Sequence, residues 1–120
     1  MPGLPAFVLK KLYVKGSLKN TDEGFVLSIR NTLAPGTITG IAPLQVDGQS
    51  YPLEKISLQV GEASLPASEI SVSAPYQFPL NATATIRVAG EALASGAHQV
   101  VITVKSQEVG ELKISVSDTL

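Results

Sequence analysis

A repeated alternation of apolar and polar residues, with a period of two, constrains this chain most. It recurs in four stretches, residues 25–30, 83–88, 98–105 and 112–117. Successive side chains of a β-strand point to opposite faces, so each stretch predicts a strand with one buried and one solvated face. No segment has a convincing helical period. The pattern therefore predicts an all-β protein.

A similar alternation in residues 12–19 predicts a further strand, with Leu12 and Leu18 on its inner face and Tyr13 on its wet face. The residues at 20–24, Asn-Thr-Asp-Glu-Gly, favour turns. We therefore expect this strand to form a hairpin with the strand that begins near Phe25.

Turn signals divide the middle of the chain. A strand over residues 37–46 is interrupted near Pro43, which indicates an edge position or a bulge. Asp47-Gly48 suits a two-residue type I′ turn and predicts that residues 49–53 pair back onto residues 42–46. A strand follows at 56–60. The proline-rich stretch 61–79 predicts a loop with one short strand at 70–73.

The expected architecture follows from this spacing. Seven or eight short strands, 8–12 residues apart, are typical of a sandwich or barrel. We predict a two-sheet antiparallel sandwich of immunoglobulin-like topology. The length of 120 residues suits one domain, which we place at 12–120 behind an apolar N-terminal arm at 1–11.

The composition restricts the classes of partner and the cellular location that we expect. The chain has no cysteine, which favours a reducing, cytoplasmic location and excludes thiolate chemistry. Its net charge is −1 and its nine basic residues are dispersed, so we expect no nucleic-acid partner. No apolar run is long enough for a membrane helix, and the N-terminus lacks the basic region of a signal peptide. We therefore expect no membrane association and no export.

His98 is the sharpest candidate for chemistry, because it heads an apolar strand face and is the only histidine. A structural histidine, hydrogen-bonded to a neighbouring loop, is the favoured interpretation over a catalytic one. A single histidine does not predict a metal site, and no glycine-rich loop follows a strand. We expect no catalytic residue, no metal and no cofactor.

Apolar and aromatic residues are the better candidates for contacts with a partner or ligand. Charged residues make up only 16% of the chain, below the average of about 25%. This suggests that part of the surface is covered by another molecule. The candidate contact residues, with His98, are Leu4, Phe7, Val8 and Leu9 of the arm and Tyr76 and Phe78 of the proline-rich loop.

Three short segments, Gly24-Phe25, Val46-Asp47-Gly48 and Leu93-Ala94-Ser95-Gly96-Ala97-His98-Gln99-Val100, together resemble the small β subunit of bacterial C-glycoside deglycosidases. The similarity spans residues 12–116. It implies a β-sandwich that docks on a larger TIM-barrel subunit, which supplies the metal and the acid/base residues. The sequence also resembles short prokaryotic proteins labelled hydroxymethylglutaryl-CoA reductase, although it contains no dinucleotide-binding pattern.

The leading hypothesis is a noncatalytic accessory or scaffold subunit that binds a protein, either a second copy or a larger enzyme. We expect the chain not to be a plain monomer at micromolar concentration. The main alternative is a free-standing module that binds a carbohydrate or another small ligand. The third is a small hydrolase that uses His98 with a nearby carboxylate.

Overall fold

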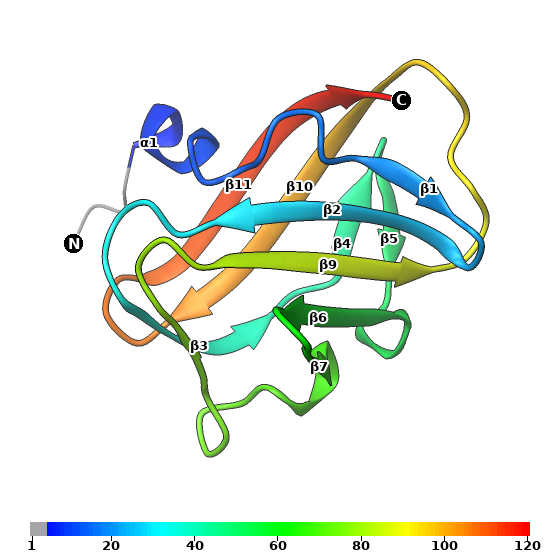
Figure 1. Ribbon diagram of the computed structural model, residues 1–120. Coiled ribbons are helices and arrows are strands. Elements are labelled where there is room, and N and C mark those ends of the chain that lie inside the picture. Colours follow the sequence, from blue (N-terminus) through cyan, green and yellow to red (C-terminus); the bar gives the residue numbers. More distant parts are fainter. Residues whose placement is uncertain (1–4) are drawn as a thin grey trace.

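The computed structural model describes residues 5–120 and contains two β-sheets packed face to face (Figure 1). The first sheet contains, in spatial order, β1 (Lys19–Thr21), β2 (Gly24–Arg30), β9 (Thr83–Ala89), β6 (Ile56–Val60) and β7 (Ala63–Pro66). The second contains β5 (Gln49–Tyr51), β4 (Leu44–Val46), β10 (Ala97–Ser106), β3 (Gly36–Ile41) and β8 (Tyr76–Phe78), and β11 (Gly110–Thr119) pairs with β10.

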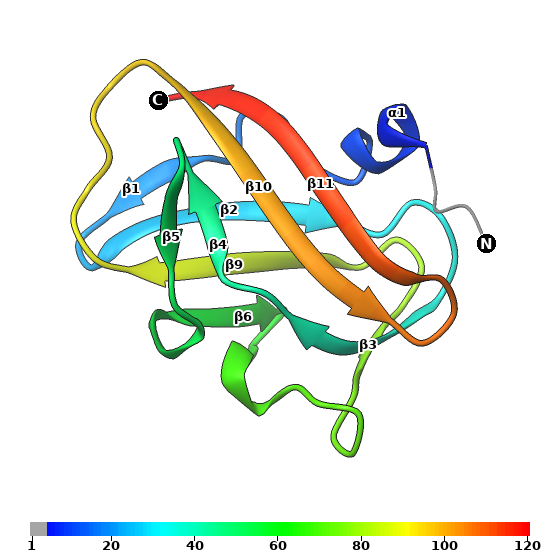
Figure 2. The ribbon, with the colours of Figure 1, turned by 180° about the vertical axis from the view of Figure 1, so that it is seen from behind.

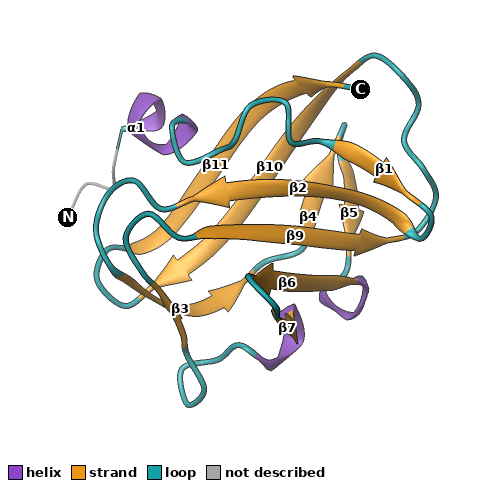
Figure 3. Ribbon diagram, viewed as in Figure 1, coloured by secondary structure: helices purple, strands orange, loops and turns teal. Residues whose placement is uncertain are grey.

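Helical structure is confined to three short segments in the described residues, and strands dominate the ribbon (Figure 3). These segments are the α-helix α1 (Ala6–Lys10) and the 3₁₀ helices η1 (Leu53–Lys55) and η2 (Ala67–Glu69). The prediction of an all-β sandwich is confirmed.

The strand order also follows the immunoglobulin pattern. That fold places strands A-B-E-D in one sheet and C-F-G in the other. Here β1-β2-β9-β6 form the first sheet in this order, and β3-β10-β11 lie side by side in the second. All the pairings in both sheets are antiparallel.

The central strand of the second sheet is β10, seen from behind in Figure 2. One edge of β10 pairs with β11 along its whole length, and the other edge is shared by β4 and β3. Ile41 at the end of β3 pairs with Val104, and Gln45 of β4 pairs with Val101, so the three residues 42–44 lie opposite only two residues of β10. Of the two alternatives predicted at Pro43, an edge position or a bulge, the register shows a bulge.

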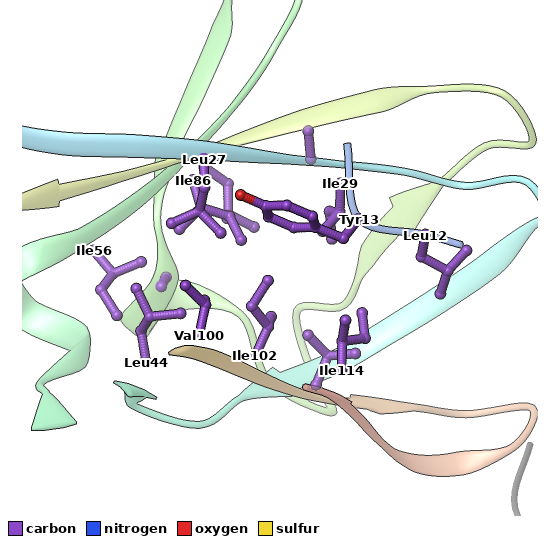
Figure 4. Packing of buried hydrophobic residues seen from close by; sticks show 14 of the residues in the cluster. Leu12, Tyr13, Leu27, Ile29, Leu44, Ile56, Ile86, Val100, Ile102 and Ile114 are labelled. Atoms are coloured by element: carbon purple, nitrogen blue, oxygen red, sulfur yellow. The ribbon is translucent and has the colours of Figure 1, made fainter. Parts of the chain in front are cut away.

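The core lies between the inner faces of the sheets. Phe25, Leu27 and Val100 are completely buried, and each lies on the face that the alternation predicts. Figure 4 shows side chains of the first sheet, among them Ile86, pointing toward side chains of the second, among them Ile102. Apolar burial of this kind is the main stabilising contribution in a domain of this size.

Two predictions about strands are wrong. Residues 12–19 form turns and an isolated bridge between Tyr13 and Ile29, and β1 begins only at Lys19. Residues 70–73 form a bend, whereas strands occur on either side of them, at β7 and β8. Local alternation did not reveal that residues 12–19 form turns, because hydrogen bonds to distant residues determine the conformation of this segment.

Asp118 makes those distant hydrogen bonds. The Asp118 residue is only 3% exposed. Oδ2 accepts hydrogen bonds from the Tyr13 hydroxyl (2.6 Å) and from the backbone N–H groups of Gly16 (2.9 Å) and Leu18 (3.3 Å). Oδ1 accepts one from the N–H of Thr119 (2.8 Å). The turn before β1 is thus bound to β11, and Tyr13 is buried although its position in the alternation predicts a wet face.

These contacts also set the ionisation of the pair. Burial would raise the pKa of Asp118, but the hydrogen bonds from Tyr13 and from three backbone N–H groups outweigh burial and lower it. Burial, together with the bond to Asp118, raises the pKa of the Tyr13 hydroxyl far above its ordinary range. The pair is therefore an anionic carboxylate bound by a neutral phenol.

The segment predicted as an apolar arm forms α1 after Pro5, and α1 lies against β11. The carbonyl oxygen of Pro5 accepts hydrogen bonds from the N–H groups of Val8 and Leu9. Leu9 is 7% exposed and belongs to the hydrophobic core. The end of this segment is therefore part of the sandwich.

Gly48→Val should lower the free energy of unfolding by about 1–2 kcal/mol, because a branched side chain is strained at a positive φ. Asp47 and Gly48 have φ of 53° and 85°, as the type I′ turn requires, and no atom lies within 4 Å of a Cβ built on Gly48. Urea denaturation measures the change. Gly36→Val is the control, since Gly36 has similar free space without a positive φ, and an equal loss in both variants would contradict strain at the turn.

Tyr13→Phe should lower the free energy of unfolding by about 1.5–3 kcal/mol, the usual range for a hydrogen bond to a charged group. The variant keeps the ring but removes the donor nearest to Asp118. Tyr51→Phe is a matched control, because the Tyr51 hydroxyl makes no hydrogen bond with the described residues. Chemical denaturation of both variants at neutral pH makes the comparison, and equal stabilities would refute the role given to Tyr13.

Candidate functional site

An apolar cavity of about 270 Å³ lies between the two sheets. Its inner wall is formed by buried side chains of both sheets, including Ile86 of β9 and Ile102 of β10. The lining continues to the end of the sandwich where β2 leads into β3 and β10 turns into β11. The cavity thus extends from the interior of the sandwich to one of its ends.

The mouth of this cavity reaches solvent. Leu33, Ala34 and Pro35 of the β2–β3 loop line the cavity and are exposed, as is Glu108 in the β10–β11 turn. Leu33 is 41% exposed. The entrance is therefore apolar on one side and carries one carboxylate on the other.

Polar side chains near the mouth fix its loops. Asn31 Nδ2 donates to the carbonyl oxygens of Ala34 (2.7 Å) and Phe78 (2.9 Å). Glu108 Oε1 accepts a hydrogen bond from the N–H of Thr37 at 2.9 Å, and this bond lowers the pKa of the Glu108 carboxyl. Ser106 Oγ accepts one from the N–H of Val109 at 3.0 Å. These groups hold the entrance in one shape.

Two of the residues predicted for contacts line this cavity. Tyr76 is half-buried and Phe78 is 9% exposed, and their ring centroids lie 6.3 Å apart. Burial raises the pKa of the Tyr76 hydroxyl. Both residues lie on β8, which the sequence pattern did not predict as a strand, so they form part of a wall instead of a flexible loop.

The candidate contact residues of the N-terminal arm differ in their exposure to solvent. Phe7 is 66% exposed, Val8 is half-buried and Leu9 is in the core. Leu4 lies outside the described residues. Of this group, Phe7 is the side chain best placed for contact with another molecule, and α1 carries it at the same end of the sandwich as the β2–β3 loop (Figures 1 and 2).

His98 lies at the other end of β10 and takes no part in the cavity. Its Nδ1 lies 2.6 Å from Asp47 Oδ2, and its Nε2 lies 2.7 Å from the carbonyl oxygen of Ala94. Asp47 Oδ1 also accepts the N–H of Gln99 at 2.8 Å. The ring thus joins the β4–β5 turn to the loop before β10, as expected for a histidine hydrogen-bonded to a neighbouring loop.

Both partners of His98 are acceptors, so the protonated imidazolium, which donates from both nitrogens, fits best. The Ala94 carbonyl, followed by the Asp47 carboxylate, raises the pKa of His98. The N–H of Gln99, followed by His98, lowers the pKa of Asp47. A ring held in this way has no free nitrogen with which to accept a proton from a nucleophile.

The described residues 5–120 contain no group of three or more His, Cys, Asp and Glu side chains placed to hold a metal ion. No helix in this part of the chain is long and apolar enough to cross a membrane.

Sequence reasoning missed several residues of these sites. Leu33 at the mouth of the cavity is an exposed loop residue, and no local pattern distinguishes an exposed leucine from a buried one. Asp118 had a signal, because it continues the inward positions of Leu112 and Ile114 by steps of two. A carboxylate on an inner face requires hydrogen-bond donors, and that requirement could have indicated its role.

The fold is a small all-β sandwich domain with an apolar cavity between its two sheets. Residues 8–120 match the family model described as "Hydroxymethylglutaryl-CoA reductase, N-terminal domain". The chain belongs to this family, which confirms the resemblance to proteins with that label. No curated protein matches the sequence significantly. The resemblance to the deglycosidase small subunit stays a prediction.

Asp47→Asn should lower the pKa of His98 toward its ordinary value of 6.5, because it removes the negative partner of the ring. NMR titration of the single histidine measures this directly. Because the pKa of His98 is raised in the folded state, the contacts of the protonated ring stabilise the fold fully below pH 6.5. This contribution is lost as the pH rises through the raised pKa. Because the pKa of Asp47 is lowered, the contacts of its ionised carboxylate stabilise the fold above the ordinary pKa of 3.8. That contribution to stability is lost as the pH falls through the lowered pKa.

The difference in melting temperature between wild type and Asp47→Asn should therefore be largest between about pH 4 and 6.5 and should shrink above it. Asp22→Asn, in the exposed β1–β2 turn, is the control for loss of one surface charge. A His98 pKa that is the same in wild type and Asp47→Asn would contradict the assigned pair.

Proposed function

We propose that this chain is a noncatalytic accessory domain that binds a partner enzyme through one end of its sandwich. The observation that carries the proposal is the gathering of exposed apolar side chains there, which we call the apolar end: Phe7 of α1, Leu33 and Pro35 of the β2–β3 loop, and Leu80 of the β8–β9 loop. Contiguous apolar surface commonly marks an interaction site.

The backbone supports this grouping. The β2–β3 and β8–β9 loops are tied by hydrogen bonds from the N–H of Asn31 to the carbonyl oxygen of Ala82 (2.9 Å) and from the N–H of Asn81 to the carbonyl oxygen of Asn31 (2.6 Å). Leu33 and Leu80 are 41% and 46% exposed on these two joined loops. A fixed apolar surface can bind with less loss of conformational entropy than flexible loops.

Two observations support a noncatalytic role. Both ring nitrogens of His98 are engaged by acceptors, which disfavours the hydrolase hypothesis. The family description also names one domain of an enzyme rather than an enzyme. For the partner we propose a TIM-barrel subunit of the C-glycoside deglycosidase type, on the basis of the resemblance in residues 12–116.

The double variant Leu33→Ser/Leu80→Ser should weaken binding to such a subunit by at least tenfold, since burial of each leucine contributes about 1.5–3 kcal/mol and about 1.4 kcal/mol is tenfold. The full chain is mixed with the purified TIM-barrel subunit, and complex formation is measured by light scattering and calorimetry. Val72→Ser is the control, because Val72 is 82% exposed in a different loop.

Two results would contradict the proposal. One is a monomeric mass for the full chain at micromolar concentration together with no complex. The other is turnover of an ester or glycoside by the isolated chain that disappears in His98→Ala while the circular dichroism spectrum is unchanged.

A further inference from the structure

The cavity between the sheets is large for a domain of this size. Protein interiors are close-packed, with few voids larger than a water molecule. An engineered apolar cavity of about 150 Å³ stays dry and binds benzene. The cavity here, at about 270 Å³, is nearly twice as large, and its lining is almost entirely apolar.

The buried part of the lining offers no unsatisfied polar side-chain atom to a polar ligand. The buried polar side chains in the lining, Asn31 and Ser106, already make hydrogen bonds to the backbone. No buried side-chain nitrogen or oxygen in the described residues lacks a hydrogen-bond partner. A sugar would lose the hydration of its hydroxyl groups without compensation, which costs several kcal/mol. The cavity therefore selects against carbohydrate.

Charge at the mouth adds a second criterion. Among the described residues that line the cavity, Glu108 is the only Asp, Glu, Lys or Arg, and it is exposed at the entrance. The Thr37 N–H holds its carboxylate in place. A ligand whose body occupies the cavity places its head group near this negative charge. Anionic head groups such as carboxylates are disfavoured there, and uncharged or cationic ones are accepted.

We propose that the cavity binds an aliphatic molecule of about ten carbon atoms, a size scaled from benzene in 150 Å³, with an uncharged or cationic head group next to Glu108. In this proposal the aliphatic part of the ligand lies between β9 and β10. Its head group lies between the β2–β3 loop and the β10–β11 turn. This site goes beyond the proposed accessory role and does not rest on it, because it requires only the isolated chain.

The test uses the full chain and four probes: decan-1-ol, decylammonium, decanoate and glucose. The two ionic amphiphiles are kept below the concentrations at which they form micelles. Calorimetry should show that decan-1-ol and decylammonium bind, that decanoate binds about tenfold more weakly than decylammonium, and that glucose does not bind. Glu108→Gln keeps an acceptor for the Thr37 N–H but removes the charge, and it should abolish the difference between decylammonium and decanoate.

A cavity-filling pair of variants locates the site. Ala84 on β9 is 2% exposed and lines the cavity, whereas Ala89 on the same strand is exposed. Ala84→Leu should reduce decan-1-ol binding at least tenfold, and Ala89→Leu should leave it unchanged. If Ala84→Leu does not fold, NMR contacts in the wild type between decan-1-ol and the methyl groups of Ile86 and Ile102 decide the question.

Failure of decan-1-ol to bind the wild-type chain would overturn the proposal, as would binding that persists in a folded Ala84→Leu. Equal binding of decanoate and decylammonium by the wild type would overturn the assignment of the head group. These results are independent of the TIM-barrel complex, so failure of either proposal can be recognised separately.

Discussion

The arrangement of the two sheets depends on the hydrogen bonds that the carboxylate of Asp118 accepts. This carboxylate is buried, and it accepts hydrogen bonds from Tyr13, Gly16, Leu18 and Thr119. The first three precede β1 of the first sheet, whereas Asp118 lies on β11 of the second. Apolar contacts alone would hold the sheets together without fixing their relative position, because the hydrophobic effect is not directional. The carboxylate supplies the direction, and removal of its donors would leave a buried charge uncompensated.

The hydrogen bonds of Asp118 and His98 lie at the opposite end of the molecule from the cavity mouth. Asp118 pairs in register with His98, so the hydrogen-bonded groups gather where β10 begins and β11 ends. The cavity opens where β10 ends and β11 begins, beside Leu33 and Glu108. Hydrogen bonds of Asn31, Ser106 and Glu108 hold the loops at the cavity mouth, so both ends of the sandwich are fixed by polar contacts, and only the second opens into an apolar cavity. Both proposals place binding at that second end.

The strands with strict alternation could be predicted from sequence because burial on one face dictates both pattern and structure, as in β2, β9, β10 and β11. The turn at Asp47-Gly48 could also be predicted, since few residue pairs accept its backbone angles. Residues 12–19 have the same alternation, yet they form turns because Asp118, about a hundred residues away, binds their N–H groups and the Tyr13 hydroxyl. The cavity was not predictable, because it depends on the volumes of side chains that meet only in the fold. Sequence pointed to Tyr76 and Phe78 through their aromatic character, but not to the wall that they form.

The lengths of the outer strands have a consequence for self-assembly. β1, β5, β7 and β8 contain only three or four residues each, so they offer few unpaired backbone groups to a second molecule. The exception is β11 with ten residues, and α1 lies against it while the Lys15 ammonium donates to the carbonyl oxygen of Ser117 at 2.8 Å. Edge-to-edge sheet extension, the usual route by which β-proteins aggregate, is thus restricted. A chain with so little charge can therefore expose apolar side chains at one end without turning its sheets into templates for fibre growth.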